Sequence, residues 1–287
     1  MADEMHSPKS GRPELVAPSG ACDTHIHFYG PPDRYPLAST ATFQPPLATI
    51  ERYRSVQQRL GLERVVVVQP SGYGFDNRCL LDAIRHIGDS ARGVVVVDTA
   101  VTDQQLEQMH AAGVRGIRFF MFPGGVLSWS SLDEMDGRAN ALGWHINLQL
   151  DGRTLPDHIG RLRRLTSRLV IDHTGKFIEP VSTTDRAFKM LLELVERGNC
   201  WVKLAAPYET SRDGPPHYHD VGRLAKALVK AAPQRMLWAS NWPHPSAQDN
   251  PPDDAALLDL LLEWAGDEAV CRRILVDNPA DLYGFGR

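Results

Sequence analysis

The chain has 287 residues, of which 43% are hydrophobic and 23% are charged, and its formal net charge is −4. This length and composition are typical of a soluble globular protein with one large domain or two smaller ones. The slightly negative charge gives no electrostatic reason to expect a nucleic acid or an anionic membrane as a partner. The sequence has no long apolar run and no apolar segment near its first residue, so we predict neither a membrane span nor a secretion signal.

The first residues and the cysteines indicate where the folded domain begins and in which compartment the protein works. Residues 1–20 are rich in proline, serine, glycine and charged side chains, so we expect a flexible tail there and one folded domain over residues 21–287. The four cysteines lie far apart and form no Cys-x-x-Cys pair: Cys22, Cys79, Cys200 and Cys271. Such spacing is typical of buried thiols in a reducing compartment, not of a disulfide framework or a zinc knuckle. We therefore expect a cytoplasmic protein.

From residue 21 onwards, strand patterns alternate with helical patterns. The apolar run at residues 65–68 is typical of a strand buried on both faces of a parallel sheet, whereas the spacing of Tyr53, Val56 and Leu60 is typical of an amphipathic helix. The expected strands lie at residues 21–27, 64–69, 93–98, 114–120, 145–150, 169–173, 200–205 and 236–241. The expected helices lie at residues 47–60, 80–87, 103–112, 131–142, 155–165, 185–197, 221–228 and 255–264, with a short capping helix at 267–276.

Eight strands, each followed by a helical segment, predict a single (β/α)8 barrel of the α/β class. The competing fold is a doubly wound open sheet. It is disfavoured because no Gly-x-Gly-x-x-Gly turn follows the first strand. In (β/α)8 barrels the catalytic side chains lie at the carboxyl ends of the strands, so polar residues at these positions are candidates for a site.

The first expected strand carries two histidines, His25 and His27, whose side chains should share one face because they are two residues apart. Two adjacent imidazoles can bind a metal ion or polarise a carbonyl oxygen, and the alternative is a strand with two hydrogen-bonded histidines of no catalytic importance. Gln149 also stands out, because a buried amide in an apolar strand costs free energy unless it is hydrogen bonded. The other polar side chains at strand ends are Ser71, Tyr73, Arg118, His173, Lys176, Lys203, Tyr208, Asn241 and His244.

Four segments carry a resemblance to a known family. They are Asp23-Thr24-His25-Ile26-His27, Arg115-Gly116-Ile117-Arg118-Phe119, Ile171-Asp172-His173-Thr174-Gly175 and Trp242-Pro243-His244-Pro245. Together they resemble the amidohydrolase superfamily and, more narrowly, its branch that contains 2-pyrone-4,6-dicarboxylate lactonase. The resemblance covers the chain from about residue 21 to the ending at residues 277–279. It implies an amidohydrolase-like barrel and a metal-independent hydrolase whose general base is an aspartate at the end of the last strand.

This chain has Asn241 at the position of that aspartate. An amide cannot take a proton from water near neutral pH, and it is a poorer ligand for a divalent ion than a carboxylate. The strand after His173 also carries no second histidine. We therefore predict no bound metal and no other cofactor, and we expect that the site does not activate water.

The resemblance then implies a lactone isomerase that lacks the general base, with a small-molecule sugar-acid lactone as its substrate. It would convert a sugar-diacid 1,5-lactone, such as D-galactaro-1,5-lactone, to the 1,4-lactone in galacturonate catabolism. We predict that His25, His27 and His173 stabilise the oxyanion that forms at the lactone carbonyl. A hydroxyl of the substrate itself would attack, because proximity can replace much of the missing base catalysis. Asn241 would orient the substrate, and His173 would carry the proton.

The remaining strand-end residues are predicted to bind the substrate. Arg118 can hold a carboxylate with two parallel hydrogen bonds, and Lys176 can hold it as a point charge. Ser71, Gln149 and Tyr208 complete the predicted substrate site. Three alternatives remain open: a lactonase that opens a sugar-acid or dicarboxylate lactone with His173 as the base for water, a catalytically silent barrel that binds a sugar acid, and a metal-dependent amidohydrolase.

Overall fold

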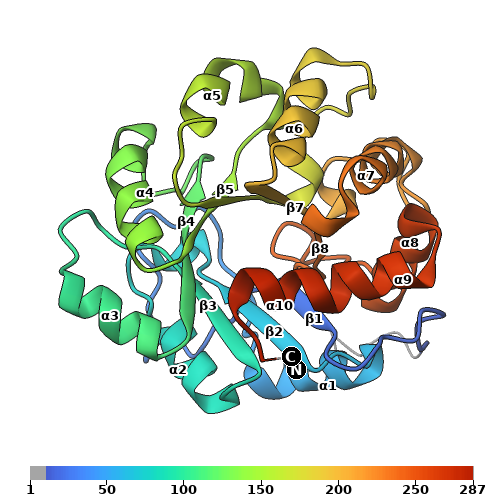
Figure 1. The fold of residues 1–287 in the computed structure, drawn as a ribbon. Helices are drawn as coiled ribbons and strands as arrows, with labels where there is room; N and C mark the ends of the chain where they lie inside the picture. The colour runs from blue at the N-terminus through green and yellow to red at the C-terminus, as the bar shows by residue number, and fades with distance from the viewer. Residues whose placement is uncertain (1–10, 287) are drawn as a thin grey trace.

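The computed structural model describes residues 11–286, and these form one parallel eight-stranded sheet surrounded by helices (Figure 1). The strands follow one another around the sheet in sequence order. They are β1 (Cys22–Ile26), β2 (Arg64–Val68), β3 (Ala91–Val95), β4 (Val114–Phe120), β5 (His145–Gln149), β6 (Arg168–Ile171), β7 (Cys200–Leu204) and β8 (Met236–Trp238). The predicted (β/α)8 barrel is confirmed.

Helices cover the outside of the barrel, and the last helix lies across one end of it (Figure 1). They are α1 (Ile50–Leu60), α2 (Arg78–Ile87), α3 (Asp103–Ala111), α4 (Leu132–Ala141), α5 (Leu155–Leu162), α6 (Arg186–Glu196), α7 (His219–Ala231), α8 (Asp254–Ala265), α9 (Glu268–Arg272) and α10 (Asn278–Tyr283). Local sequence signals fix several of their ends. Thr49 caps the start of α1 by accepting a hydrogen bond from the amide of Arg52, and Gly61 ends α1 in a left-handed conformation that glycine adopts without strain.

The sheet closes into a barrel where β8 meets β1. The Thr24 hydroxyl donates a hydrogen bond to the carbonyl oxygen of Trp238 at 2.8 Å, and the amide of Asn241 donates to the carbonyl oxygen of His25 at 3.0 Å. Asp23 stabilises the same junction. Its carboxylate accepts hydrogen bonds from the hydroxyl of Ser240 at 2.5 Å and from the backbone amide of Ser240 at 3.1 Å. The junction therefore places Asn241 directly beside His25.

Seven strands end earlier than the sequence predicts, four of them by one residue and β3, β6 and β8 by two or three. The prediction ran to residue 173 in β6 and to residue 241 in β8, whereas these strands end at Ile171 and Trp238. Neither strand can continue through the last predicted residue, because His173 has φ of 54° and Asn241 has φ of 64°, in the left-handed region that cannot continue a strand. The predicted capping helix at 267–276 also differs, because after α9 the chain makes a π-helical turn at Arg273–Asp277 and continues into α10.

The apolar side chains form two clusters. The larger cluster joins the outward-facing strand residues, such as Val65 and Val67, to the surrounding helices. The smaller cluster joins Val66 and Val68 to side chains of α10 and the residues after it, including Leu282, Tyr283 and Phe285. Alternate residues of a strand point to opposite faces, so the smaller cluster fills the barrel interior and α10 packs against it.

The predicted flexible tail falls partly outside the described residues, which begin at Gly11. Within the described part, Leu15 is buried, and its amide donates a hydrogen bond to Asp259 of α8 at 2.9 Å. None of the helices in residues 11–286 combines the length and the apolar character that crossing a bilayer requires.

Candidate active site

His25 and His27 lie side by side, as their spacing predicts, and their Nε2 atoms are 3.2 Å apart. The Nδ1 atom of His27 is 2.8 Å from the carbonyl oxygen of Val68, so we assign its proton to Nδ1 and an acceptor role to its Nε2. His25 then carries its proton on Nε2, because its Nδ1 faces the ammonium group of Lys203 at 3.1 Å. Burial lowers the pKa of both rings, that of His27 to about 3. In the neutral pair the N–H of His25 therefore points to Nε2 of His27, and a substrate oxygen that uses this N–H has to take it over from His27.

A buried lysine contacts Nδ1 of His25, the ring nitrogen that does not face His27. Lys203 of β7 is fully buried, and its ammonium group donates to Asn147 Oδ1 at 2.6 Å and lies 3.2 Å from Asp172 Oδ1. Asn147 in turn donates to Asp172 Oδ2 at 2.8 Å. Burial alone would raise the pKa of Asp172, but the charge of Lys203 and the contact with His25 outweigh it and hold that pKa well below its usual value. Asp172 and Lys203 therefore form a charged pair inside the barrel.

His25, Asp172 and His173 form a group in the described chain whose ligand atoms would suit a metal ion, since these atoms lie within 4.8 Å of one another. The ammonium group of Lys203 already contacts two of these three residues, since it lies 3.1 Å from His25 Nδ1 and 3.2 Å from Asp172 Oδ1. A divalent cation bound there would lie next to a buried positive charge and would compete with it for the same carboxylate. These residues therefore do not fit a divalent ion well.

His173 lies in a strained turn just after β6. It and its neighbours Thr174 and Lys176 have φ values of 54°, 55° and 42°, a conformation that is rare for residues other than glycine and often marks functional sites. The turn brings the His173 ring to 5.0 Å from the His25 ring, measured between centroids. Its Nδ1 is buried without a hydrogen-bond partner in the part of the chain that the structure describes, and burial lowers its pKa to about 4. A neutral imidazole with a spare nitrogen thus faces the His25 side of the site.

Asn241 is held by a chain of hydrogen bonds from α8. Asp254 Oδ1 lies 3.0 Å from His244 Nε2, and His244 Nδ1 lies 3.0 Å from the hydroxyl oxygen of Tyr208. That hydroxyl oxygen accepts a hydrogen bond from Asn241 Nδ2 at 2.9 Å, and the same nitrogen lies 3.3 Å from Glu209 Oε1. The amide group of Asn241 is therefore fixed, with its N–H bonds directed towards Tyr208 and Glu209.

Glu209 is a site residue that the sequence analysis missed. It ends the short 3-10 turn Pro207–Glu209 after β7, and its side chain is only 7% exposed. Its Oε1 also accepts a hydrogen bond from the hydroxyl of Ser246 at 2.6 Å, and its Oε2 forms an ion pair with Lys176. Burial would raise the pKa of Glu209, but the charges of Lys176 and His173 lower it to about 2. The only sequence signal was its position next to Tyr208 in a loop that follows a strand.

The ion pair with Glu209 occupies the ammonium group of Lys176, which the sequence analysis predicted to bind the substrate. The sequence prediction left Lys176 free to bind a carboxylate of the substrate, whereas in the structure its ammonium group already binds a carboxylate of the protein. The ammonium group also lies 5.4 Å from the centre of the Phe122 ring. A substrate carboxylate would therefore have to compete with Glu209 for Lys176.

Arg118 is a buried cation with unused hydrogen-bonding capacity. Its Nη1 donates to the carbonyl oxygen of Gln69 and its Nη2 donates to Gln149 Oε1, each at 2.7 Å, so two of the predicted substrate-binding residues lie in contact. It is 4% exposed and has no carboxylate within ion-pair distance among residues 11–286. Ser71 and Arg118 line the same small hollow. A buried guanidinium group without a counter-ion is suited to bind an anionic ligand.

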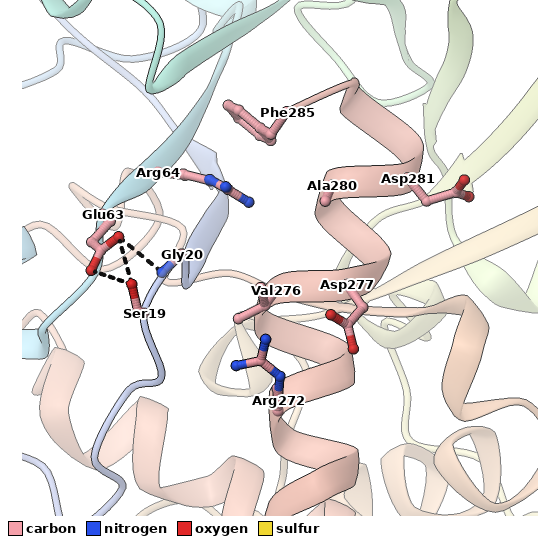
Figure 2. Close-up of a pocket in the computed structure, with 10 residues that line it drawn as sticks. All are labelled: Ser19, Gly20, Glu63, Arg64, Arg272, Val276, Asp277, Ala280, Asp281 and Phe285. Carbon is pink, nitrogen blue, oxygen red and sulfur yellow. Dashed lines mark hydrogen bonds between the residues drawn. The ribbon is translucent and has the colours of Figure 1, made fainter. Parts of the chain in front are cut away.

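A hollow of about 690 Å³ lies at the opposite end of the barrel and contains none of the predicted site residues. Figure 2 shows α10 on one side of it and Glu63 with Arg64 on the other, where Glu63 accepts hydrogen bonds from Ser19 and Gly20. Ser19, Gly20 and Glu63 lie just before β1 and β2, whereas chemistry in barrels of this kind takes place where the strands end. The candidate active site is therefore the buried cluster around His25 and Asn241.

The chain was also compared with known proteins. A family model described as Amidohydrolase matches residues 22–285. A D-galactarolactone isomerase from Agrobacterium fabrum is 40% identical over 275 residues, which cover 94% of this chain and 93% of that protein. A 2-pyrone-4,6-dicarboxylate hydrolase from Comamonas testosteroni is 34% identical, over 95% of this chain and 92% of that protein. The crystal structure of an Agrobacterium tumefaciens protein without ligand superimposes with a TM-score of 0.90 at 40% identity, over 96% of this chain and 99% of the other.

Proposed function

The chain belongs to the amidohydrolase family, and we propose that it is a lactone isomerase that converts a sugar-diacid 1,5-lactone, such as D-galactaro-1,5-lactone, into the 1,4-lactone. The observation that carries the proposal is Asn241, an amide fixed beside His25 at the position where the resemblance places the water-activating aspartate of the lactonases. The relative with 40% identity, which is named D-galactarolactone isomerase, supports this choice of reaction and substrate.

The geometry assigns a role to each group around the lactone carbonyl. The carbonyl oxygen takes the N–H of His25, which in the free protein points to Nε2 of His27. Attack by a hydroxyl of the same substrate places negative charge on this oxygen, and a fixed N–H donor stabilises that charge. Asn241 orients the attacking hydroxyl, and His173 passes a proton to the ring oxygen as it leaves. Because the hydroxyl and the carbonyl belong to one molecule, no second reactant has to be bound and oriented.

The substrate's free carboxylate is assigned to Arg118. Each terminal nitrogen of the guanidinium group carries two N–H bonds, of which the contacts with Gln69 and Gln149 use one each. The remaining N–H bonds can hold a carboxylate, and Ser71 lies next to Arg118 in the same hollow. Lys176, Gln149 and Tyr208 complete the proposed substrate site.

The second candidate function is a metal-independent lactonase, which would open the same ring with water. Glu209 favours it, because an ionised carboxylate beside Asn241 can accept a proton from water. Relatives named as lactone hydrolases, including a 2-pyrone-4,6-dicarboxylate hydrolase at 34% identity, are consistent with this alternative.

The two functions differ in their product. We expect ¹³C NMR of D-galactaro-1,5-lactone incubated with the protein near neutral pH to show the 1,4-lactone forming faster than in a blank. Free galactarate as the first product would indicate the lactonase. Binding without turnover would indicate a silent barrel and contradict both enzymatic proposals.

The variant Asn241→Asp tests whether the amide at residue 241 is what prevents hydrolysis. It restores a carboxylate at the last strand, so we expect galactarate to appear among its products. The new carboxylate would lie next to Glu209, and two adjacent carboxylates raise the pKa of one of them, so hydrolysis by the variant should increase as the pH rises. A variant that forms only the 1,4-lactone would show that the amide is not what prevents hydrolysis.

A further inference from the structure

We propose that Glu209 is the base of this site: it takes the proton from the attacking hydroxyl and gives it up again when the ring oxygen leaves. This inference rests on the proposed acyl transfer and deepens it, since the sequence analysis left the reaction without a base. Glu209 is the carboxylate that the described structure places in contact with Asn241, the residue assigned to hold the hydroxyl.

The position of the carboxylate supports this role. Asn241 Nδ2 lies 3.3 Å from Glu209 Oε1, which is long for an N–H···O hydrogen bond. This contact is weak enough for a substrate hydroxyl beside the two groups to replace it, accepting a hydrogen bond from the amide and donating one to the carboxylate. Ser246 holds Oε1 at 2.6 Å, and in the free protein Lys176 pairs with Oε2, so the carboxylate has a defined orientation before the substrate binds.

The ion pair with Lys176 links the strength of the base to substrate binding. In the free protein, Lys176 and His173 keep the pKa of Glu209 at about 2, so the group is ionised but only weakly basic. A bound substrate brings a second carboxylate to the Arg118 side of the site, and Lys176 can turn towards it. Glu209 then loses part of the positive charge that lowers its pKa and becomes a stronger base while the substrate is bound.

The proton and bond changes balance without a further reactant. The hydroxyl oxygen bonds to the carbonyl carbon as its proton passes to Glu209. Glu209 then passes this proton to the spare nitrogen of His173, and its restored negative charge favours the imidazolium form of that ring. As the tetrahedral intermediate collapses, the bond between the carbonyl carbon and the ring oxygen breaks, and the imidazolium gives a proton to the ring oxygen, so the site regains its starting state.

The test compares Glu209→Gln with Glu209→Asp and with Glu179→Gln, a control at a carboxylate that is 60% exposed and pairs with Arg153 on the surface. We expect Glu209→Gln to lower kcat about 100-fold or more, the range of a lost general base, with little change in KM. The residual rate of Glu209→Gln should rise with pH, because hydroxide then replaces the carboxylate as the base. The rate of Glu209→Asp should lie between those of Glu209→Gln and the wild type. The control Glu179→Gln should match the wild type. Thermal melting of each variant shows whether it is folded.

Two results would overturn the role of Glu209: a wild-type kcat in Glu209→Gln, or equal losses in the Gln and Asp variants that appear mainly in KM. These are distinguishable from failure of the proposed function, because the wild-type product alone decides between isomerase and lactonase. A measurement without turnover is the ¹³C NMR titration of labelled glutamate with and without D-galactarate, the unreactive open diacid. We expect bound galactarate to raise the pKa of Glu209, and an unchanged pKa would contradict the proposal.

Discussion

At the scale of single residues, the candidate site contains polar atoms that the folded protein leaves without partners. His173 Nδ1, Arg118 Nε and Gln69 Oε1 are buried and make no hydrogen bond within residues 11–286. Each such atom costs about 1–3 kcal/mol of stability. Arg118 donates to the backbone carbonyl oxygen of Gln69, and its charge lowers the pKa of His173, so Arg118 lies near both residues. Stability lost there is recovered when a polar ligand supplies the missing hydrogen bonds.

Arg118→Gln tests the assignment of the carboxylate. We expect KM for the lactone to rise about 10- to 100-fold, because a hydrogen bond to a charged group contributes about 1.5–3 kcal/mol. The change in kcat should be smaller, since Arg118 is assigned to binding and not to the reacting carbonyl. The matched control is Arg85→Gln, on the exposed face of α2, where the pairing with Asp82 is solvated. Equal KM values for Arg118→Gln and the wild type would contradict the assignment.

The sequence predicted part of this site, for physical reasons. The two-residue spacing of a strand brings His25 and His27 together, and the rule for strand ends brings Arg118 to Gln149. Glu209, and with it the ion pair that occupies Lys176, could not be predicted, because Glu209 lies in a loop whose path depends on packing that no periodic pattern reports. Sequence spacing therefore identified groups on strands and missed the carboxylate on a loop.

At the scale of elements, three neighbouring strands carry a polar layer beneath the histidines. Asn147 of β5, Asp172 after β6 and Lys203 of β7 bind one another at 2.6–3.2 Å. Each is buried, so their hydrogen bonds must replace water. The layer fixes His25 through Lys203, which links the stability of the barrel to the orientation of the catalytic N–H.

Lys203→Met tests this layer. Removing one partner of a buried ion pair leaves the other charge uncompensated, so we expect the free energy of unfolding to fall by about 3–5 kcal/mol. The double variant Lys203→Met with Asp172→Asn removes both charges and should recover part of this loss. Urea denaturation measures both variants. Equal stability of the single variant and the wild type would contradict the account of the layer.

The junction between β1 and β8 contains an acid with a raised pKa. Burial raises the pKa of Asp23 from 3.8 to about 6, although hydrogen bonds from Ser240 partly offset the effect. The folded protein therefore binds this proton more tightly than the unfolded chain does. The resulting contribution to stability is fully present below pH 3.8 and is lost as the pH rises through about 6, by on the order of 3 kcal/mol.

The variant Asp23→Asn cannot titrate and provides the reference. We expect the wild type to lose stability relative to this variant as the pH rises through about 6, and the difference to be constant at higher pH. Urea denaturation at a series of pH values measures the difference. A difference that does not change across this range would contradict the raised pKa.

The alternation of strands and helices could be predicted, but the ends of the strands could not. Continuous runs of valine identify β2, and helical spacing identifies α1, because burial imposes those periods. The ends of β6 and β8 depend on left-handed backbone at His173 and Asn241. Neither residue is glycine, so the sequence gives no sign of that conformation.

At the scale of the whole molecule, the barrel joins residues from distant parts of the chain into a site with little access to water. His25 in the first strand and Asn241 after the last are connected by a backbone hydrogen bond of 3.0 Å. Their side chains and that of His173 are nearly completely buried. Exclusion of bulk water leaves a hydroxyl of the bound substrate as the nucleophile that competes best for the carbonyl.

The most direct test of this central claim is the reaction carried out in H₂¹⁸O. Intramolecular acyl transfer consumes no water, so mass spectrometry of the 1,4-lactone should show no ¹⁸O beyond that in a blank. Hydrolysis followed by ring closure would place ¹⁸O in the carboxyl group and carry part of it into the lactone. An unlabelled product supports transfer within a site closed to water, and a labelled one would contradict it.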